Sequence, residues 1–159
     1  MPYDPRMTQP FRDELTQAGF TELHTAAEVD ASIALKGTTL VVVNSVCGCA
    51  AGQARPGVSL AVRHPLRPER LVTVFAGQDL EATARVRSYF TGAAPSSPSI
   101  GILRDGKLVY LLQRHEIQMM DARAVAAALG GAFEAVAGGG MAEEAVAAPA
   151  SGLGLPTRV

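Results

Sequence analysis

The two cysteines of this chain, Cys47 and Cys49, are separated by a single glycine and are the residues best suited to chemistry. They follow an apolar run, residues 40–43, that is typical of a buried strand, and they precede a segment, 50–63, that we expect to be helical. The first turn of a helix presents unpaired N–H groups and partial positive charge, which favour an anion. A thiol there loses its proton more readily, and the thiolate is the reactive form. The pair therefore predicts thiol–disulfide chemistry.

The spacing of the pair also limits how the two thiols can be joined. Residues i and i+2 of an ideal helix point to nearly opposite sides, so Cys47 and Cys49 cannot both be helical and bridged. Gly48 tolerates the unusual backbone angles that a tight ring would need. Such a ring should be strained, and strained disulfides are easier to reduce. We therefore expect a Cys47–Cys49 disulfide to be a short-lived oxidised form, with a reduction potential above about −300 mV.

Polar residues on either side of the pair are candidates for supporting roles. Asn44 and Ser45 could hydrogen-bond the sulfur, although capping of the following helix is the favoured interpretation. No acidic residue interrupts the strand 38–44, so we expect no buried carboxylate that relays protons there. Several positively charged side chains follow the pair. We interpret them as a solvated basic face, and the less favoured interpretation is that they recruit an anionic thiol. They are Arg55, Arg63, Arg67 and Arg70.

Composition restricts the class of protein. The chain has 159 residues, 48% of them hydrophobic, which suits one domain with a proper core. A net charge of −1 and the absence of tryptophan argue against nucleic-acid or anionic-membrane partners. Residues 1–6 lack the apolar stretch of a secretory signal, so we expect a cytoplasmic location. There a cysteine pair is more often catalytic, redox-sensing or metal-binding than structural. The three histidines have no metal-ligand spacing, so no metal site is expected.

Hydrophobic periodicity and turn signals predict an α/β domain spanning residues 1–137. The Gly/Ala-rich segment 138–159 is predicted to be a disordered tail. The elements expected along the chain are a helix over 11–18 after Pro10, a short strand over 20–24, a helix from 26 closed before Gly37, a strand over 38–44, a helix over 50–63 kinked or broken at Pro56, a strand over 71–75, a helix capped by Asp79, a hairpin of 99–103 and 107–112 around Asp105-Gly106, and a last helix from Asp121 interrupted at Gly130-Gly131.

This order predicts a mixed central sheet with helices on both faces, because a β-α-β unit needs parallel strands and the hairpin adds antiparallel ones. Binding and catalytic sites in such sheets lie beyond the carboxyl ends of the parallel strands. Cys47 falls at such a position.

Several blocks of the chain resemble known proteins. The cysteine motif at a strand end, Pro56 in the following helix and the Ser97-Pro98 pair before the penultimate strand resemble the thioredoxin fold. Residues 38–52, 74–79, 89–99 and 114–117 resemble the bacilliredoxins, within a similarity that runs from about 10 to about 136. The resemblance implies a thioredoxin-like three-layer α/β/α sandwich with a mixed central sheet, a C-terminal β-hairpin and a helix.

The activity that this resemblance implies is reduction of mixed disulfides between protein cysteines and bacillithiol. Cys47 would be the attacking thiol and Cys49 the second, resolving thiol. The Ser97-Pro98 bond would be cis, and backbone groups before the proline would hold the substrate chain. No bound cofactor is implied. Bacillithiol would be a co-substrate, and the expected partners are bacillithiolated client proteins and an external disulfide reductase.

Some members of that family carry a further cysteine just after the last helix, whereas residues 133–137 of this chain lead into glycines without one. A mechanism that uses a third thiol is therefore unavailable here. Two alternatives use the same Cys47–Cys49 pair. One is protein disulfide isomerisation. The other is a non-enzymatic Cys-x-Cys module that binds a soft ion such as Cu(I) through two thiolates.

Overall fold

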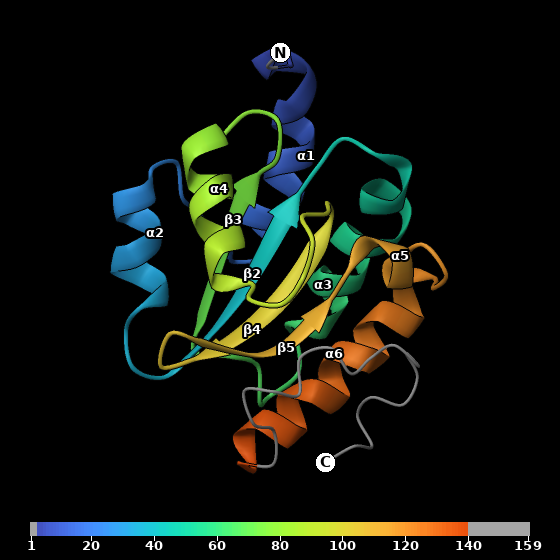
Figure 1. The fold of residues 1–159 in the computed structure, drawn as a ribbon. Coiled ribbons are helices and arrows are strands. Elements are labelled where there is room, and N and C mark those ends of the chain that lie inside the picture. The colour runs from blue at the N-terminus through green and yellow to red at the C-terminus, as the bar shows by residue number, and fades with distance from the viewer. Residues whose placement is uncertain (1–2, 140–159) are drawn as a thin grey trace.

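A five-stranded mixed sheet forms the centre of the protein (Figure 1), as seen in a computed structural model that describes residues 3–139. The strand order is β1-β3-β2-β4-β5. The first three strands in sequence run parallel, and β4 and β5 are antiparallel to their neighbours. The strands are β1 (Thr21–Glu22), β2 (Thr38–Asn44), β3 (Arg70–Phe75), β4 (Ser99–Arg104) and β5 (Lys107–Leu112). The predicted mixed sheet is confirmed.

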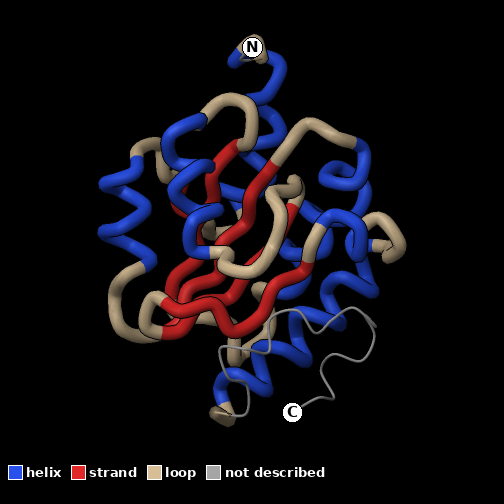
Figure 2. Tube along the Cα trace, viewed as in Figure 1, coloured by secondary structure: helices blue, strands red, loops and turns tan. Residues whose placement is uncertain are grey.

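Helices cover both faces of this sheet, which gives the expected three-layer α/β/α sandwich (Figure 2). One face carries α1 (Pro5–Gln17), the π-helical turn η1 (Ala50–Ala54), α3 (Arg55–Ala61) and α6 (Ala122–Ala137). The other face carries α2 (Ala26–Ile33) and α4 (Leu80–Tyr89). A short helix, α5 (Arg114–Ile117), links β5 to α6 and has no counterpart among the predicted elements.

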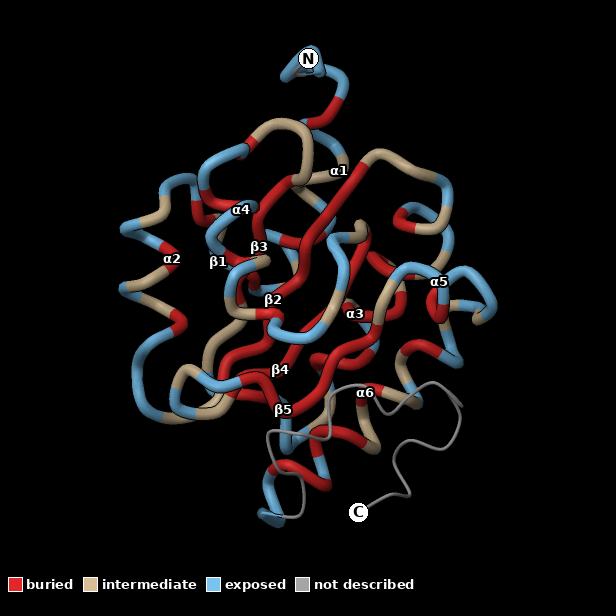
Figure 3. Tube along the Cα trace, in the orientation of Figure 1, coloured by how far each residue is buried: buried red, intermediate tan, exposed pale blue. Residues whose placement is uncertain are grey.

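Strand β2 lies at the middle of the sheet and separates two hydrophobic cores. Leu40 and Val42 face the core formed with α1, α3 and α6. Val41 and Val43 face the core formed with α2 and α4. All four side chains are fully buried, and β2, β4 and β5 are drawn mostly as buried in Figure 3. Burial on both faces explains why this strand is a continuous apolar run rather than an alternating one.

The predicted hairpin turn is confirmed by its backbone angles. Asp105 and Gly106 both have positive φ, 53° and 81°, as a two-residue type I′ turn requires. They connect β4 to β5 as predicted. Gly37 was predicted to close the helix that begins at 26, but α2 ends at Ile33 with Ala34 as its C-cap. Gly37, with φ of 96°, lies beyond the cap and leads into β2.

Two helix boundaries differ from the prediction. α1 begins at Pro5, because the carboxylate of Asp4 accepts a hydrogen bond from the Arg6 N–H and caps the helix. Pro10 therefore lies inside α1 rather than before it. α6 also continues through Gly130 and Gly131 without interruption. Buried apolar side chains on either side of this glycine pair hold the helix against the core, which outweighs the low helix propensity of glycine.

α6 ends at Ala137, and the segment predicted to be a tail lies, from residue 140 onward, outside the described residues. The predicted domain boundary therefore stays a prediction. Across residues 3–139, no helix combines the length and the apolar character that crossing a bilayer would need.

Candidate active site

The cysteine pair lies where β2 ends and the next helical segment begins, as predicted. The carbonyl oxygen of Cys47 accepts hydrogen bonds from the N–H groups of Ala50 and Ala51, at 3.0 and 3.2 Å. Cys47 is therefore the residue that opens the first turn, and its side chain is half-buried. The helical segment starts as the π-helical turn η1 and changes to α-helix at Arg55. Pro56 occupies the first turn of α3, where a missing N–H removes few helical hydrogen bonds. The break that was predicted at Pro56 corresponds to this junction between π-helix and α-helix.

The two sulfur atoms are 3.0 Å apart as free thiols. Burial by itself raises the pKa of Cys47. Hydrogen bonds from the Cys49 thiol, the Ser45 hydroxyl and the backbone N–H of Ala50 and Cys49 outweigh that effect and lower the pKa below its ordinary value. Burial and the neighbouring Cys47 sulfur raise the pKa of Cys49. The arrangement therefore favours one thiolate, at Cys47, with a protonated thiol in contact with it.

Gly48 was predicted to permit a tight Cys47–Cys49 ring, and the structure holds the two cysteines as free thiols. Gly48 is exposed, its φ is not positive, and a methyl group added there would meet open space. In the dithiol form, then, the conformational freedom of glycine is not used at this position. A supporting role for Gly48 applies only to the bridged form.

Asn44 and Ser45 are buried and shape the chain before the pair. The side-chain oxygen of Asn44 accepts the Ser45 N–H at 2.8 Å, and the Ser45 hydroxyl oxygen accepts the Cys47 N–H at 3.3 Å. Ser45 thus binds the backbone of Cys47 rather than the N–H groups of the helix that follows. The favoured interpretation, helix capping, is wrong in this detail.

A buried arginine, Arg55, binds the same segment before the cysteine pair. Arg55 is 1% exposed, so the prediction that it belongs to a solvated basic face is wrong. Its guanidinium donates to the Asn44 side chain at 3.1 Å and to the Ser45 carbonyl at 2.8 Å. It also pairs with Glu14 at 2.9 Å and stacks 4.6 Å over the Phe11 ring. A guanidinium supplies the several donors in one plane that this site uses.

The loop before β4 faces the cysteine pair. The Ser97–Pro98 peptide bond is cis, as predicted, and Pro98 is buried. One pocket, of about 310 Å³, is lined by Ser97, Ser45 and Cys47. Cys49 and Pro98 are not among its lining residues. Two arginines that the sequence analysis did not select, Arg87 and Arg114, line this pocket as well.

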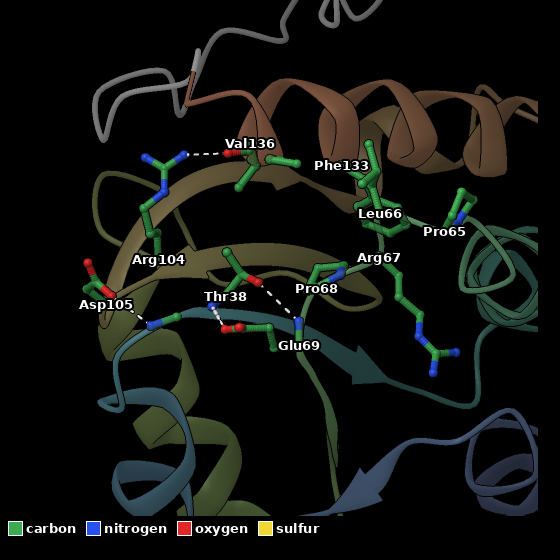
Figure 4. A pocket seen from close by; sticks show the side chains of 12 residues that line it. Thr38, Pro65, Leu66, Arg67, Pro68, Glu69, Arg104, Asp105, Phe133 and Val136 are labelled. Atoms are coloured by element: carbon green, nitrogen blue, oxygen red, sulfur yellow. Dashed lines mark hydrogen bonds between the residues drawn. The ribbon is translucent and has the colours of Figure 1, made fainter.

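A larger pocket, of about 460 Å³, lies at the opposite end of β2 (Figure 4). Thr38 at the start of β2 and Arg104 at the end of β4 help to line it. A seven-residue strand spans roughly 20 Å, so this pocket is remote from Cys47. Its lining contains no cysteine and no histidine. The thiol chemistry therefore belongs to the smaller pocket.

The part of the chain from residue 3 to residue 139 contains no group of three or more His, Cys, Asp or Glu side chains placed to hold a metal ion. Cys47 and Cys49 offer two sulfur ligands at most, which is fewer than a closed zinc site needs.

Comparison with known proteins agrees with this geometry. Residues 3–137 match the family described as disulphide isomerase. The chain is 52% identical over 137 residues to a bacilliredoxin of Koribacter versatilis, a match that covers 86% of this chain and 94% of that protein. It is 54% identical over 123 residues to bacilliredoxins of Bacillus cereus and of Geobacillus kaustophilus, which covers 77% of this chain and 85% of each relative. These matches support a role in thiol–disulfide redox chemistry, and they show that the chain belongs to the bacilliredoxin family.

Proposed function

We propose that this protein removes bacillithiol from protein cysteines by thiol–disulfide exchange through Cys47. The observation that carries the proposal is the Cys47 thiol itself. It is half-buried, its pKa is lowered, and its sulfur lies 3.0 Å from that of Cys49. It lines a pocket together with Ser97, the residue before a cis proline.

In the first step, the Cys47 thiolate attacks the bacillithiol sulfur of the mixed disulfide. A bond forms between the Cys47 sulfur and the bacillithiol sulfur, and the bond between bacillithiol and the client cysteine breaks. The client leaves as a thiolate and takes a proton from water. Exchange of this kind needs a thiolate, an accessible sulfur and a leaving thiol, and it involves no net oxidation.

In the second step, Cys49 loses its proton and attacks the Cys47 sulfur. A Cys47–Cys49 disulfide forms, and bacillithiol leaves. The raised pKa of Cys49 suits this order, because that residue stays a thiol, and a hydrogen-bond donor, while Cys47 carries the negative charge. An external disulfide reductase in the cytoplasm would then return two electrons to the pair. Alternatively, free bacillithiol would attack the adduct on Cys47 and leave as its own disulfide for that reductase.

The loop before β4 is proposed to hold the client. Ser97 lines the pocket beside Cys47, and the cis bond to Pro98 turns the chain there. An extended client segment would lie along the backbone of Ser97 as a short added strand, with its cysteine over Cys47.

The test uses a client protein with a single cysteine that carries bacillithiol, followed by intact mass. The unaltered protein should release the client thiol, and Cys47→Ala should not. Cys49→Ala should still release it and should accumulate a bacillithiol adduct on Cys47. If Cys47→Ala frees the client as fast as the unaltered protein, the proposal is wrong.

The reduction potential of the pair gives a second measurement. A transient Cys47–Cys49 disulfide should have a potential above about −300 mV. A lower value would make the bridge a structural one and would remove Cys49 from the catalytic cycle.

A second candidate activity, disulfide isomerisation, is favoured by the description of the matched family. It would use the same Cys47 thiolate on a protein disulfide, with Cys49 as an escape thiol. Rates on a scrambled protein and on a bacillithiolated protein, measured at equal concentrations, separate the two. Faster reaction of the bacillithiolated protein is the expected result.

A further inference from the structure

The pocket beside Cys47 has a positively charged lining. Besides the residues of the cysteine loop, it is bordered by Arg87 from α4 and by Arg114 from the first position of α5. No Asp or Glu side chain lines it. Among residues 3–139, neither of these arginines forms an ion pair with a carboxylate.

Arg87 is held in the protein with much of its hydrogen-bonding capacity unused. Its Nε atom is buried and has no hydrogen-bond partner within the described part of the chain. Its Nη2 atom donates only a long hydrogen bond, 3.5 Å, to the carbonyl oxygen of Ser96. Burying a guanidinium without a partner is unfavourable, so an anion in the pocket would stabilise it. Arg87 also lines the pocket, so an anion there would meet a guanidinium charge that no carboxylate of residues 3–139 balances.

Arg114 connects the same pocket to the cysteine pair. Its Nη1 atom donates to the carbonyl oxygen of Ser97 at 3.4 Å, directly before the cis proline. Burial raises the pKa of Cys49, and the positive charge of Arg114 acts in the opposite direction. Arg114 is therefore close enough to influence the thiols, and its side chain is exposed to an incoming ligand.

We propose that Arg87 and Arg114 form a carboxylate-binding subsite for the small thiol that Cys47 accepts. This inference rests on the proposed function, because it names the part of the bacillithiol mixed disulfide that the pocket recognises. Bacillithiol carries carboxylates, and arginine binds carboxylates through paired N–H groups. Both guanidinium groups hydrogen-bond carbonyls of the loop that precedes Pro98, so one loop positions both.

The subsite would also decide which sulfur of the mixed disulfide reacts. If the carboxylates of the small thiol bind at the two arginines, its sulfur lies against Cys47 and the client sulfur points outward. Attack then forms the bond from Cys47 to the small thiol and releases the client as a thiolate. Attack on the client sulfur would instead link the client to Cys47 and release the small thiol.

The test compares three symmetric disulfides that differ in charge. They are dithiodipropionate, which is anionic, hydroxyethyl disulfide, which is neutral, and cystamine, which is cationic. The rate constant for the reaction of Cys47 with each disulfide is measured by intact mass as the loss of the free dithiol form, so that an adduct already resolved by Cys49 is counted as well. The unaltered protein should react with dithiodipropionate faster than with the neutral disulfide and with cystamine more slowly, and added salt should reduce these differences.

Two variants, Arg87→Gln and Arg114→Gln, remove one charge each. Each should lower the ratio of the dithiodipropionate rate to the neutral rate by about fivefold, the effect expected of one partly exposed charge pair. The neutral rate reports on thiolate formation and on folding. Arg63→Gln is a matched control, because Arg63 is exposed beyond the far end of α3, and it should leave the ratio unchanged.

Either of two results would overturn the subsite: an unchanged ratio in both variants, or an equal fall in the rates for all three disulfides. The second result would mean that the arginines act on the Cys47 thiolate and not on the ligand. Failure of the proposed function would look different. The protein would keep its preference for dithiodipropionate, but it would not release a bacillithiolated client.

Discussion

The guanidinium of Arg55 donates a hydrogen bond of 2.8 Å to the carbonyl oxygen of Ser45, two residues before Cys47. An interior cation thus supports the strand end that carries the reactive thiol. Arginine keeps its charge at any physiological pH, so this group cannot relay protons as a buried carboxylate could. Its role is to position the chain through Asn44 and Ser45.

Replacing Arg55 by methionine should destabilise the protein by about 2–4 kcal/mol, because the change removes a buried guanidinium together with its ion pair to the exposed Glu14, and it leaves the Ser45 carbonyl and the Asn44 oxygen short of donors. Arg55→Lys keeps the charge but cannot donate to Asn44, Ser45 and Glu14 together, so we expect a smaller loss. The free energy of unfolding in urea measures both. Arg63→Gln, an exposed change, should cost less than about 0.5 kcal/mol.

The same variants test positioning by a second readout. The rate at which iodoacetamide alkylates Cys47 at neutral pH should fall in Arg55→Met, because a displaced loop loses the hydrogen bonds that favour the thiolate. A fully stable, folded Arg55→Met protein with an unchanged alkylation rate would contradict the role that we assign to this arginine.

The thiol of Cys49 is expected to set part of the reactivity of Cys47. Burial raises the pKa of Cys47, and the hydrogen bond from Cys49 is the largest of the effects that lower it. Cys49→Ala removes this donor and should raise the pKa of Cys47, whereas Cys49→Ser supplies a hydroxyl donor and should raise it less. The pH dependence of the alkylation rate of Cys47 measures both changes.

In the unaltered protein the alkylation rate should reach its plateau at a lower pH than in Cys49→Ala, because the thiolate forms earlier. Coincident pH profiles in all three proteins would show that the 3.0 Å contact between the sulfurs has no influence on ionisation.

Local sequence patterns were sufficient to predict much of this fold. The apolar run of β2, the Asp105-Gly106 turn and the helix after Asp121 depend on residues close together in the chain. The position of Cys47 at a strand end followed from the same patterns. The cis bond at Pro98 did not, and it was predicted only from the resemblance to the thioredoxin fold.

The arginines of the site could not be predicted in this way. Arg55 reaches Glu14, 41 residues earlier, and Arg114 reaches Ser97, 17 residues earlier. An arginine in a basic stretch of sequence is usually solvated, so the residue type and its sequence neighbours predict an exposed side chain, whereas Arg55 is buried. Only the packing of α1 and of the β4 loop brings these side chains to the cysteine pair.

The carboxylate of Asp79 should contribute to stability in a pH-dependent way. Burial acts to raise the pKa of Asp79, but hydrogen bonds from Arg12, His24 and the Phe75 N–H together lower it. A lowered folded-state pKa means that the stabilisation is present above about pH 4, the unfolded value, and is lost as the pH falls through the folded-state value. Asp79→Asn should therefore cost about 2–3 kcal/mol at neutral pH and progressively less in acid.

The measurement is the free energy of unfolding as a function of pH. Asp121→Asn is the matched control, because Asp121 caps α6 from an exposed position and asparagine caps helices about as well. Parallel curves for the unaltered protein and Asp79→Asn at low pH would contradict the role of this ion pair with Arg12.

Two glycines, Gly57 and Gly52, form a matched pair of positions that tests the packing of α3 against α6. A methyl group at Gly57 would lie 2.5 Å from the side chain of Val125 and 3.1 Å from the carbonyl oxygen of Ala122, so α3 and α6 would have to separate. Gly57→Ala should therefore destabilise the protein by about 1–3 kcal/mol. A methyl group at Gly52, in η1, would meet open space, and Gly52→Ala should be neutral or stabilising by up to about 1 kcal/mol, because alanine restricts the unfolded chain. Thermal unfolding of the two variants measures both effects, and equal melting temperatures would show that α3 and α6 are not packed as closely as the structure has them.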